Sequence, residues 1–149
     1  MKRVSTIPVV FAVVFALLPG VRAQEPERIY VVGVHVGTEV VTRPELIHPE
    51  TLPINLENTS FITVALRATL LVGVDGNVRD VSITGTDFWV SDRLGRARID
   101  KSDPRWNAAE VTHVTNLAIR AWEKWRFQPA TLNGKPVPVR QPVETTLNR

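Results

Sequence analysis

The residues of this chain that could carry chemistry are few and widely spaced. The 149 residues include three histidines, at positions 35, 48 and 113, and no cysteine. None of these histidines stands in the i,i+4 pair or beside the second ligand that a zinc site needs. We therefore expect solvated histidines and no metal site.

Nucleophilic and phosphate-binding motifs are also missing. No Ser lies in a G-x-S-x-G elbow, and there is no reactive Cys. Asp75-Gly76-Asn77 lacks the spaced acidic ligands and the closing Glu of a calcium loop, and Gly73-x-x-Gly76 opens no helix. The sequence therefore predicts no catalytic residue, no cofactor and no enzyme activity.

Residues 1–23 have the pattern of an export signal. A charged start, an apolar run over 7–18 and a Pro-Gly break lead to Val21-Arg22-Ala23, with residues suited to cleavage after Ala23. The apolar run is shorter than the roughly 20 residues that span a bilayer. We expect a cleaved signal peptide, and an uncleaved membrane anchor is the alternative.

Charge excludes some classes of partner. Cleavage would remove Lys2, Arg3 and Arg22 from the 18 basic side chains and none of the 15 acidic ones, so 15 of each would remain. A neutral chain offers no electrostatic basis for binding nucleic acid or anionic lipid. Membrane contact is expected only if the leader is retained, and without Cys the fold must depend on apolar packing.

The sequence divides into an N-terminal segment, 24–43, and one small α+β domain, 44–149. Apolar residues at 29–36 indicate an extra strand in the first segment, and Pro44, Pro49 and Pro53 then exclude regular helix. Over 66–74 every second residue is apolar, which predicts a strand with one buried face. Asp75-Gly76 predicts a tight turn, and 78–84 the returning strand.

A helix is expected from Asn107 to Trp125. Apolar residues recur there at three-four spacing, and Asn107 with Glu110 matches a capping box. Pro129 disfavours helical geometry in the residue before it. Trp122, Trp125 and Phe127 are expected to supply core area, as large aromatics do in small domains.

The segment after this helix resembles the periplasmic C-terminal domain of the TonB energy-transducer family. Residues 125–137 read W-R-F-Q-P-A-T-L-N-G-K-P-V, and the family signature is W-R-F-x-P-A-x-x-N-G-K-P-V. The resemblance covers roughly 44–146 and implies about three antiparallel core strands with one packed helix, in the order β-β-α-β. It implies a structural role for the signature residues, which are Trp125, Arg126, Phe127, Pro129, Ala130, Asn133 and Gly134.

The last expected strand, 137–147, contains Pro138 and Pro142. Proline within a sheet is confined to edges and bulges, which indicates one open side. In the TonB family an edge in this region pairs with an extended segment of an outer-membrane receptor, by strand addition. The resemblance implies partner contacts at Val137, Val139, Arg140, Gln141 and Val143. Two alternatives stay open. Either the prolines only protect an exposed edge from aggregation, or the edge pairs with a second copy of the chain in a homodimer.

An insertion at about 86–106 departs from the family pattern. One interpretation is a surface loop whose aromatic residues pack back on the core. The other is a binding loop, with an interface formed by Phe88, Trp89, Arg93 and Arg96.

The first functional hypothesis is a periplasmic, non-catalytic adaptor that binds an outer-membrane receptor or another envelope protein and contributes to transport across the outer membrane. One alternative is an inner-membrane-anchored short energy transducer, although the apolar run lacks the functional His of that family. The other alternative is a secreted structural or stress protein that keeps the fold without binding a receptor.

Overall fold

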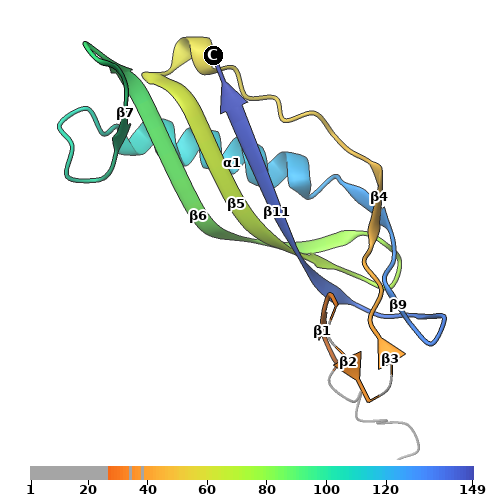
Figure 1. Ribbon diagram of the computed structural model, residues 1–149. Helices are drawn as coiled ribbons and strands as arrows, with labels where there is room; N and C mark the ends of the chain where they lie inside the picture. The colour runs from red at the N-terminus through yellow and green to blue at the C-terminus, as the bar shows by residue number, and fades with distance from the viewer. Residues whose placement is uncertain (1–26, 34, 38) are drawn as a thin grey trace, which may run out of the picture.

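The computed structural model describes residues 27–33, 35–37 and 39–149, so the signal segment expected at 1–23 lies outside the described part. The described part of the chain has an α+β fold, with one α-helix and a five-stranded sheet of order β1-β11-β5-β6-β7 (Figure 1). The elements of this sheet and the helix are β1 (Tyr30–Val31), β5 (Phe61–Val72), β6 (Val78–Asp92), β7 (Gly95–Ile99), α1 (Ala108–Trp122) and β11 (Val139–Asn148).

Three two-stranded ladders and a short 3-10 turn complete the described structure. The turn η1 (Leu56–Asn58) leads into β5. The pairs are β2 (His35–Val36) with β3 (Glu39–Val40), β4 (Glu45–His48) with β8 (Arg126–Gln128), and β9 (Thr131–Leu132) with β10 (Lys135–Pro136).

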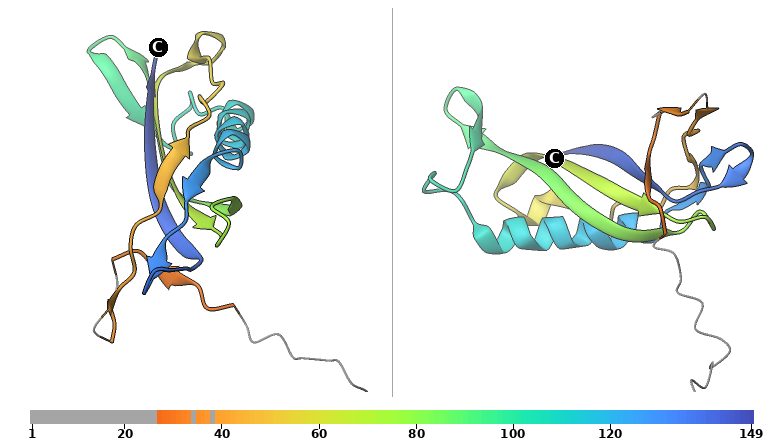
Figure 2. Two further views of the ribbon diagram at one scale, coloured as in Figure 1. Left: turned by 90° about the vertical axis from the view of Figure 1, so that its right-hand side faces the viewer. Right: turned by 90° about the horizontal axis from the view of Figure 1, so that it is seen from below.

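The protein has two layers, with α1 against one face of the sheet and no described element over the other (Figure 2). On β5 the side chains of Val64, Leu66, Leu70 and Val72 are fully buried, which confirms the expected period-two pattern. They meet the buried helix residues, chiefly Trp122. Val41 of the N-terminal segment also belongs to this core.

The turn between β5 and β6 forms at Asp75-Gly76 as expected. Gly76 has φ +76°, and its N–H donates to the Gly73 carbonyl at 2.9 Å. Strand β6 was expected to end near Thr84, but it continues to Asp92. The pairing with β5 slips by one residue between Ile83 and Gly85, which marks a bulge rather than the end of the strand.

The interpretation of 86–106 as a surface loop is wrong for most of its length, although Phe88 and Trp106 do pack on the core as that interpretation expected. Residues 86–92 extend β6, the chain reverses at Arg93-Leu94, and β7 pairs back antiparallel. Phe88 and Val90 are buried while Trp89 between them is half-buried, so the period of two continues through this stretch. The sequence of 86–99 thus carries a strand pattern, which the loop interpretation missed.

Helix α1 begins as predicted and ends earlier than predicted. The Asn107 side chain accepts from the N–H groups of Ala109 and Glu110, at 3.1 and 3.2 Å. The Glu110 carboxylate accepts from the Asn107 side-chain amide and from the N–H and hydroxyl of Ser60, at 2.8, 2.8 and 2.6 Å. The helix ends at Trp122 instead of Trp125, because the N–H groups of Lys124 and Trp125 bond at i−3 spacing, to the Ala121 and Trp122 carbonyls.

The aromatic residues after the helix pack as expected. Trp122 is 0% exposed and Phe127 5%, and the ring of Trp125 lies between them at 6.5 and 6.3 Å. Trp125 Nε1 donates to the Glu50 carbonyl at 2.9 Å, which fastens the chain before η1 to this corner.

Candidate functional site

The last strand, β11, has one paired edge and one edge that is mostly open. It pairs with β5 along its whole length, from Val139 opposite Val72 to Asn148 opposite Thr63. On its other side it pairs only with the two residues of β1, at Val139 and Arg140. From Gln141 to Asn148 no strand in the described part of the chain pairs with this outer edge.

Two hydrogen bonds define which backbone groups of β11 point outward. On the β1 side, the Tyr30 N–H donates to the Pro138 carbonyl at 3.0 Å. On the β5 side, the Arg149 N–H donates to the Ile62 carbonyl at 2.9 Å. The pairing between these points has no register shift. Since backbone groups alternate along a strand, even-numbered residues face the open edge and odd-numbered residues face β5. Glu144, Thr146 and Asn148 therefore offer N–H groups to the open edge.

The beginning of this edge is partly closed by its own residues. Pro142 faces outward and has no N–H to offer. The Gln141 side-chain amide donates to the Pro142 carbonyl at 2.9 Å, while its Oε1 is buried without a hydrogen-bond partner. The fully available stretch therefore begins after Pro142.

The five partner residues implied by the family resemblance lie at the start of β11 or before it. The Val137 N–H donates to the Ala130 carbonyl at 2.9 Å, outside the strand. Val139 is fully buried, and β1 already occupies the edge beside it and Arg140. Gln141 and Val143 direct their backbone groups toward β5. The available edge therefore lies farther along the strand than the sequence analysis expected.

Three edge residues escaped the sequence analysis. Glu144, Thr146 and Asn148 are exposed and alternate with half-buried Val143, Thr145 and Leu147. This polar-apolar alternation is visible in the sequence, but it reports which face of the sheet a side chain lies on and not the edge toward which the backbone N–H points.

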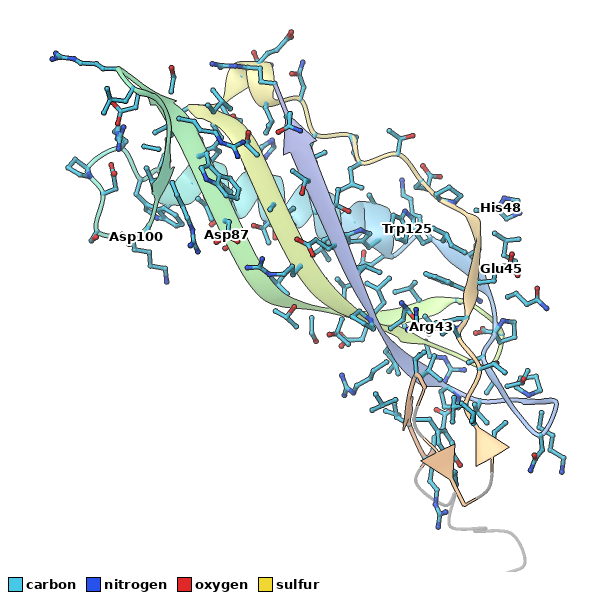
Figure 3. All side chains as sticks on the ribbon, viewed as in Figure 1. Arg43, Glu45, His48, Asp87, Asp100 and Trp125 are labelled. Atoms are coloured by element: carbon cyan, nitrogen blue, oxygen red, sulfur yellow. The ribbon has the colours of Figure 1, made fainter. Side chains whose placement is uncertain are left out.

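A second cluster lies on the uncovered face of the sheet, where β5, β6 and β7 meet. The Asp87 side chain is 11% exposed and accepts from Arg67 at 2.9 Å and from Arg98. Figure 3 shows Asp87 on β6, and the Arg96 guanidinium lies 5.6 Å from the centre of the Trp89 ring. Both acid oxygens are used internally, so this cluster ties three strands together.

The residues expected to form a loop interface are divided between core and surface. Phe88 is 0% exposed and packs on Phe61 and Trp106, at 4.7 and 5.5 Å between ring centres, so it cannot contact a partner. Trp89 is half-buried on the uncovered face, and Arg93 and Arg96 are exposed at the β6–β7 hairpin. An interface through these last three residues stays a prediction.

No family model matches the chain, and no curated protein or solved structure does either. The resemblance to the TonB C-terminal domain thus depends on the residues quoted above.

The signature residues serve local structure in this fold. Besides the aromatic corner, Ala130 is fully buried, and Arg126 donates to the Glu123 and Trp125 carbonyls at 3.3 and 2.9 Å. Asn133 and Gly134 have φ of 56° and 71°, the pair of positive angles that a two-residue hairpin turn requires.

Within the described residues, no three His, Cys, Asp or Glu side chains gather as metal ligands would. The Ser60 hydroxyl donates to Glu110 at the helix start, where Asn107 also holds the carboxylate. These hydrogen bonds lower the pKa of Glu110 below its ordinary value. No described helix is long and apolar enough to cross a membrane.

Proposed function

We propose that this protein is a non-catalytic binding module of the TonB C-terminal type, which takes up an extended peptide segment as an additional strand. The observation that carries the proposal is the open edge of β11 from Val143 to Asn148, with outward N–H groups at Glu144, Thr146 and Asn148. Unpaired strand edges of this kind are the template for strand addition.

The partner class follows from the resemblance and from the leader. An export signal and a TonB-like signature favour an outer-membrane receptor or another envelope protein as the source of the peptide, and the periplasm as the location. Contribution to transport across the outer membrane is the role that such a contact would serve.

The backbone contacts alone would give weak binding. Three outward N–H groups and the carbonyls beside them can form about six hydrogen bonds, each worth roughly 0.5–1.5 kcal/mol net. Ordering and association costs of at least ~4 kcal/mol offset most of that free energy. A partner needs further contacts, through its side chains or its ends, to reach micromolar affinity.

The proposal is tested by proline substitution at Thr146, whose N–H faces outward. Pro138 and Pro142 already occupy outward positions of the same phase, so Thr146→Pro should fold while it removes one donor from the edge. Thr146→Ala keeps the donor and is the matched control. Peptides selected from a random library should bind the alanine variant normally and the proline variant at least about fivefold more weakly; equal affinity for both variants would refute strand addition at this edge.

The cellular location of the protein tests the proposed export separately. The mass of the protein isolated from its own kind of cell should correspond to a soluble species that begins at Gln24. A full-length protein held in the inner membrane would instead favour the anchored transducer.

A further inference from the structure

A pocket marks the point at which β1 leaves the edge of β11. Strand β1 runs parallel to β11 as far as Val31, and the chain then turns away through Val32 and Gly33, which has φ +77°. The pocket that this turn leaves has a volume of about 250 Å³ and is lined by Val31, Val32, Arg43, Arg140, Gln141 and Pro142. It therefore lies directly before the available stretch of the open edge.

The lining of this pocket is cationic. Arg43 and Arg140 are both exposed, and no acidic side chain of the described residues lines the pocket. Among the described residues neither guanidinium forms an ion pair or a side-chain hydrogen bond, in contrast to Arg67, Arg79, Arg98 and Arg105. Figure 3 shows Arg43 beside the first part of β11 and near β1, in agreement with the lining of the pocket. A ligand group that fits here is an anion, and guanidinium groups match the planar geometry of a carboxylate.

The position of β1 limits how a peptide can lie on the edge. A strand paired with residues 142–148 would meet Val31 and Val32 if it were to continue past Gln141, because β1 already pairs with Arg140 and Val139. Its end, or a sharp turn, must therefore lie at the pocket. In an antiparallel strand that end is the C-terminus, with a carboxylate; in a parallel strand it is the N-terminus, with an ammonium group that both arginines would repel.

We propose that the pocket binds the C-terminal carboxylate of the incoming peptide, so that the protein recognises free C-terminal tails that pair antiparallel with β11. This inference depends on strand addition as the function of the edge. It assigns Arg43 and Arg140 as carboxylate ligands and β1 as the stop that sets the register of the peptide. The charge-assisted bonds would supply the contact that the backbone edge lacks.

The test uses two random octapeptide libraries presented to the purified protein. One library ends in a free carboxylate, and the other continues through a Gly-Ser linker into its carrier. The enriched peptides are then synthesised as free acids and as amides, and their affinities are measured by fluorescence anisotropy. Arg43→Ala and Arg140→Ala remove the proposed ligands, and Arg120→Ala removes an exposed guanidinium of α1 as the control.

The proposal predicts enrichment mainly in the free-carboxylate library and at least about tenfold weaker binding of the amides. Each pocket variant should reduce that difference between acid and amide, while Arg120→Ala should preserve it. If acids and amides bind alike but Thr146→Pro still weakens binding, strand addition stands and the carboxylate pocket is refuted. Selection of an internal Asp or Glu whose effect is the same in acid and amide forms would also refute the terminal assignment. If neither library yields a peptide that binds, both this inference and the proposed function fail.

Discussion

The carbonyl oxygen of Gly76 accepts a hydrogen bond from the Phe127 N–H at 2.9 Å, and a Cβ built on Gly76 would lie 1.8 Å from the Phe127 carbonyl oxygen. The turn between β5 and β6 and the strand after α1 thus meet backbone to backbone. Asn77 and Arg126 form a bridge beside them. Because Phe127 is itself buried, this contact joins the far end of the main hairpin to the aromatic corner that follows the helix.

We expect Gly76→Ala to destabilise the protein by about 3–5 kcal/mol, since it combines a positive φ with a backbone clash that must break the Gly76–Phe127 hydrogen bond. Gly134→Ala is the control, because Gly134 also has positive φ, at 71°, but has no atom within 4 Å of the added Cβ. That variant should lose only about 1 kcal/mol. Urea unfolding measures both, and equal losses would mean that the close approach of the two backbones is not a constraint.

Much of this arrangement could be predicted from local sequence. The alternation over 66–74 identified β5, Asp75-Gly76 identified its turn, and Asn107 identified the start of α1, because each signal depends on neighbouring residues. The pairing of β1 with β11 joins residues 109 positions apart, Tyr30 with Val139, and parallel pairing of a strand as short as β1 has no local sequence signal. The hairpin of β6 and β7 was missed because Arg96 and Arg98 gave β7 the composition of a loop.

The outward phase of β11 can be tested by stability alone. Thr145→Pro removes an N–H that faces β5 and should cost about 3 kcal/mol, whereas Thr146→Pro removes an outward N–H and should cost less than about 1 kcal/mol. The two residues are adjacent and of the same type, so they form a matched pair. If Thr146→Pro proves the more damaging change in thermal or urea unfolding, the phase assigned to this strand is reversed.

Phe88 and Trp89 should respond very differently to truncation, although the binding-loop interpretation placed both at one interface. Phe88→Ala opens a cavity beside Phe61 and Trp106 and should cost about 3–5 kcal/mol. Trp89→Ala removes a half-buried ring and its contact with Arg96, and about 1–2 kcal/mol is expected. Chemical denaturation compares them, and a loss above 3 kcal/mol for Trp89 would place that ring in the core.

The contact between Ser60 and Glu110 should make stability depend on pH. Hydrogen bonds from Ser60 and Asn107 lower the pKa of Glu110 below its ordinary value of 4.5. The Glu110 carboxylate therefore binds a proton less readily in the folded state than in the unfolded state. The stabilisation that ionised Glu110 provides is complete above pH 4.5 and is lost as the pH falls through the lowered pKa.

Glu110→Gln should accordingly lower the free energy of unfolding by about 1 kcal/mol near neutral pH. This difference between the variant and the native protein should shrink as the pH is lowered toward 3. Glu123→Gln, which removes an exposed carboxylate just after the same helix, is the control. Urea unfolding between pH 3 and 7 gives the comparison. A difference for Glu110→Gln that grows on acidification would contradict the assignment.

The binding edge was only partly predictable, for a physical reason. Pro138 and Pro142 correctly indicated that β11 has an open side. Which residues face that side depends on hydrogen bonds to β1 and β5, at Pro138 and Arg149, and such bonds are visible only in the folded chain. The resemblance therefore led to residues 137–143, while the structure has the free donors at Glu144, Thr146 and Asn148.

The central claim, that the edge of β11 takes up a strand, is tested most directly by amide hydrogen exchange of β11, followed by NMR with and without a selected peptide. In the free protein Val143, Thr145 and Leu147 should exchange slowly and Glu144, Thr146 and Asn148 quickly. Peptide binding should slow the last three selectively, by at least about tenfold, because each N–H then donates to the added strand. Unchanged exchange at Glu144, Thr146 and Asn148 with the peptide bound would contradict the account.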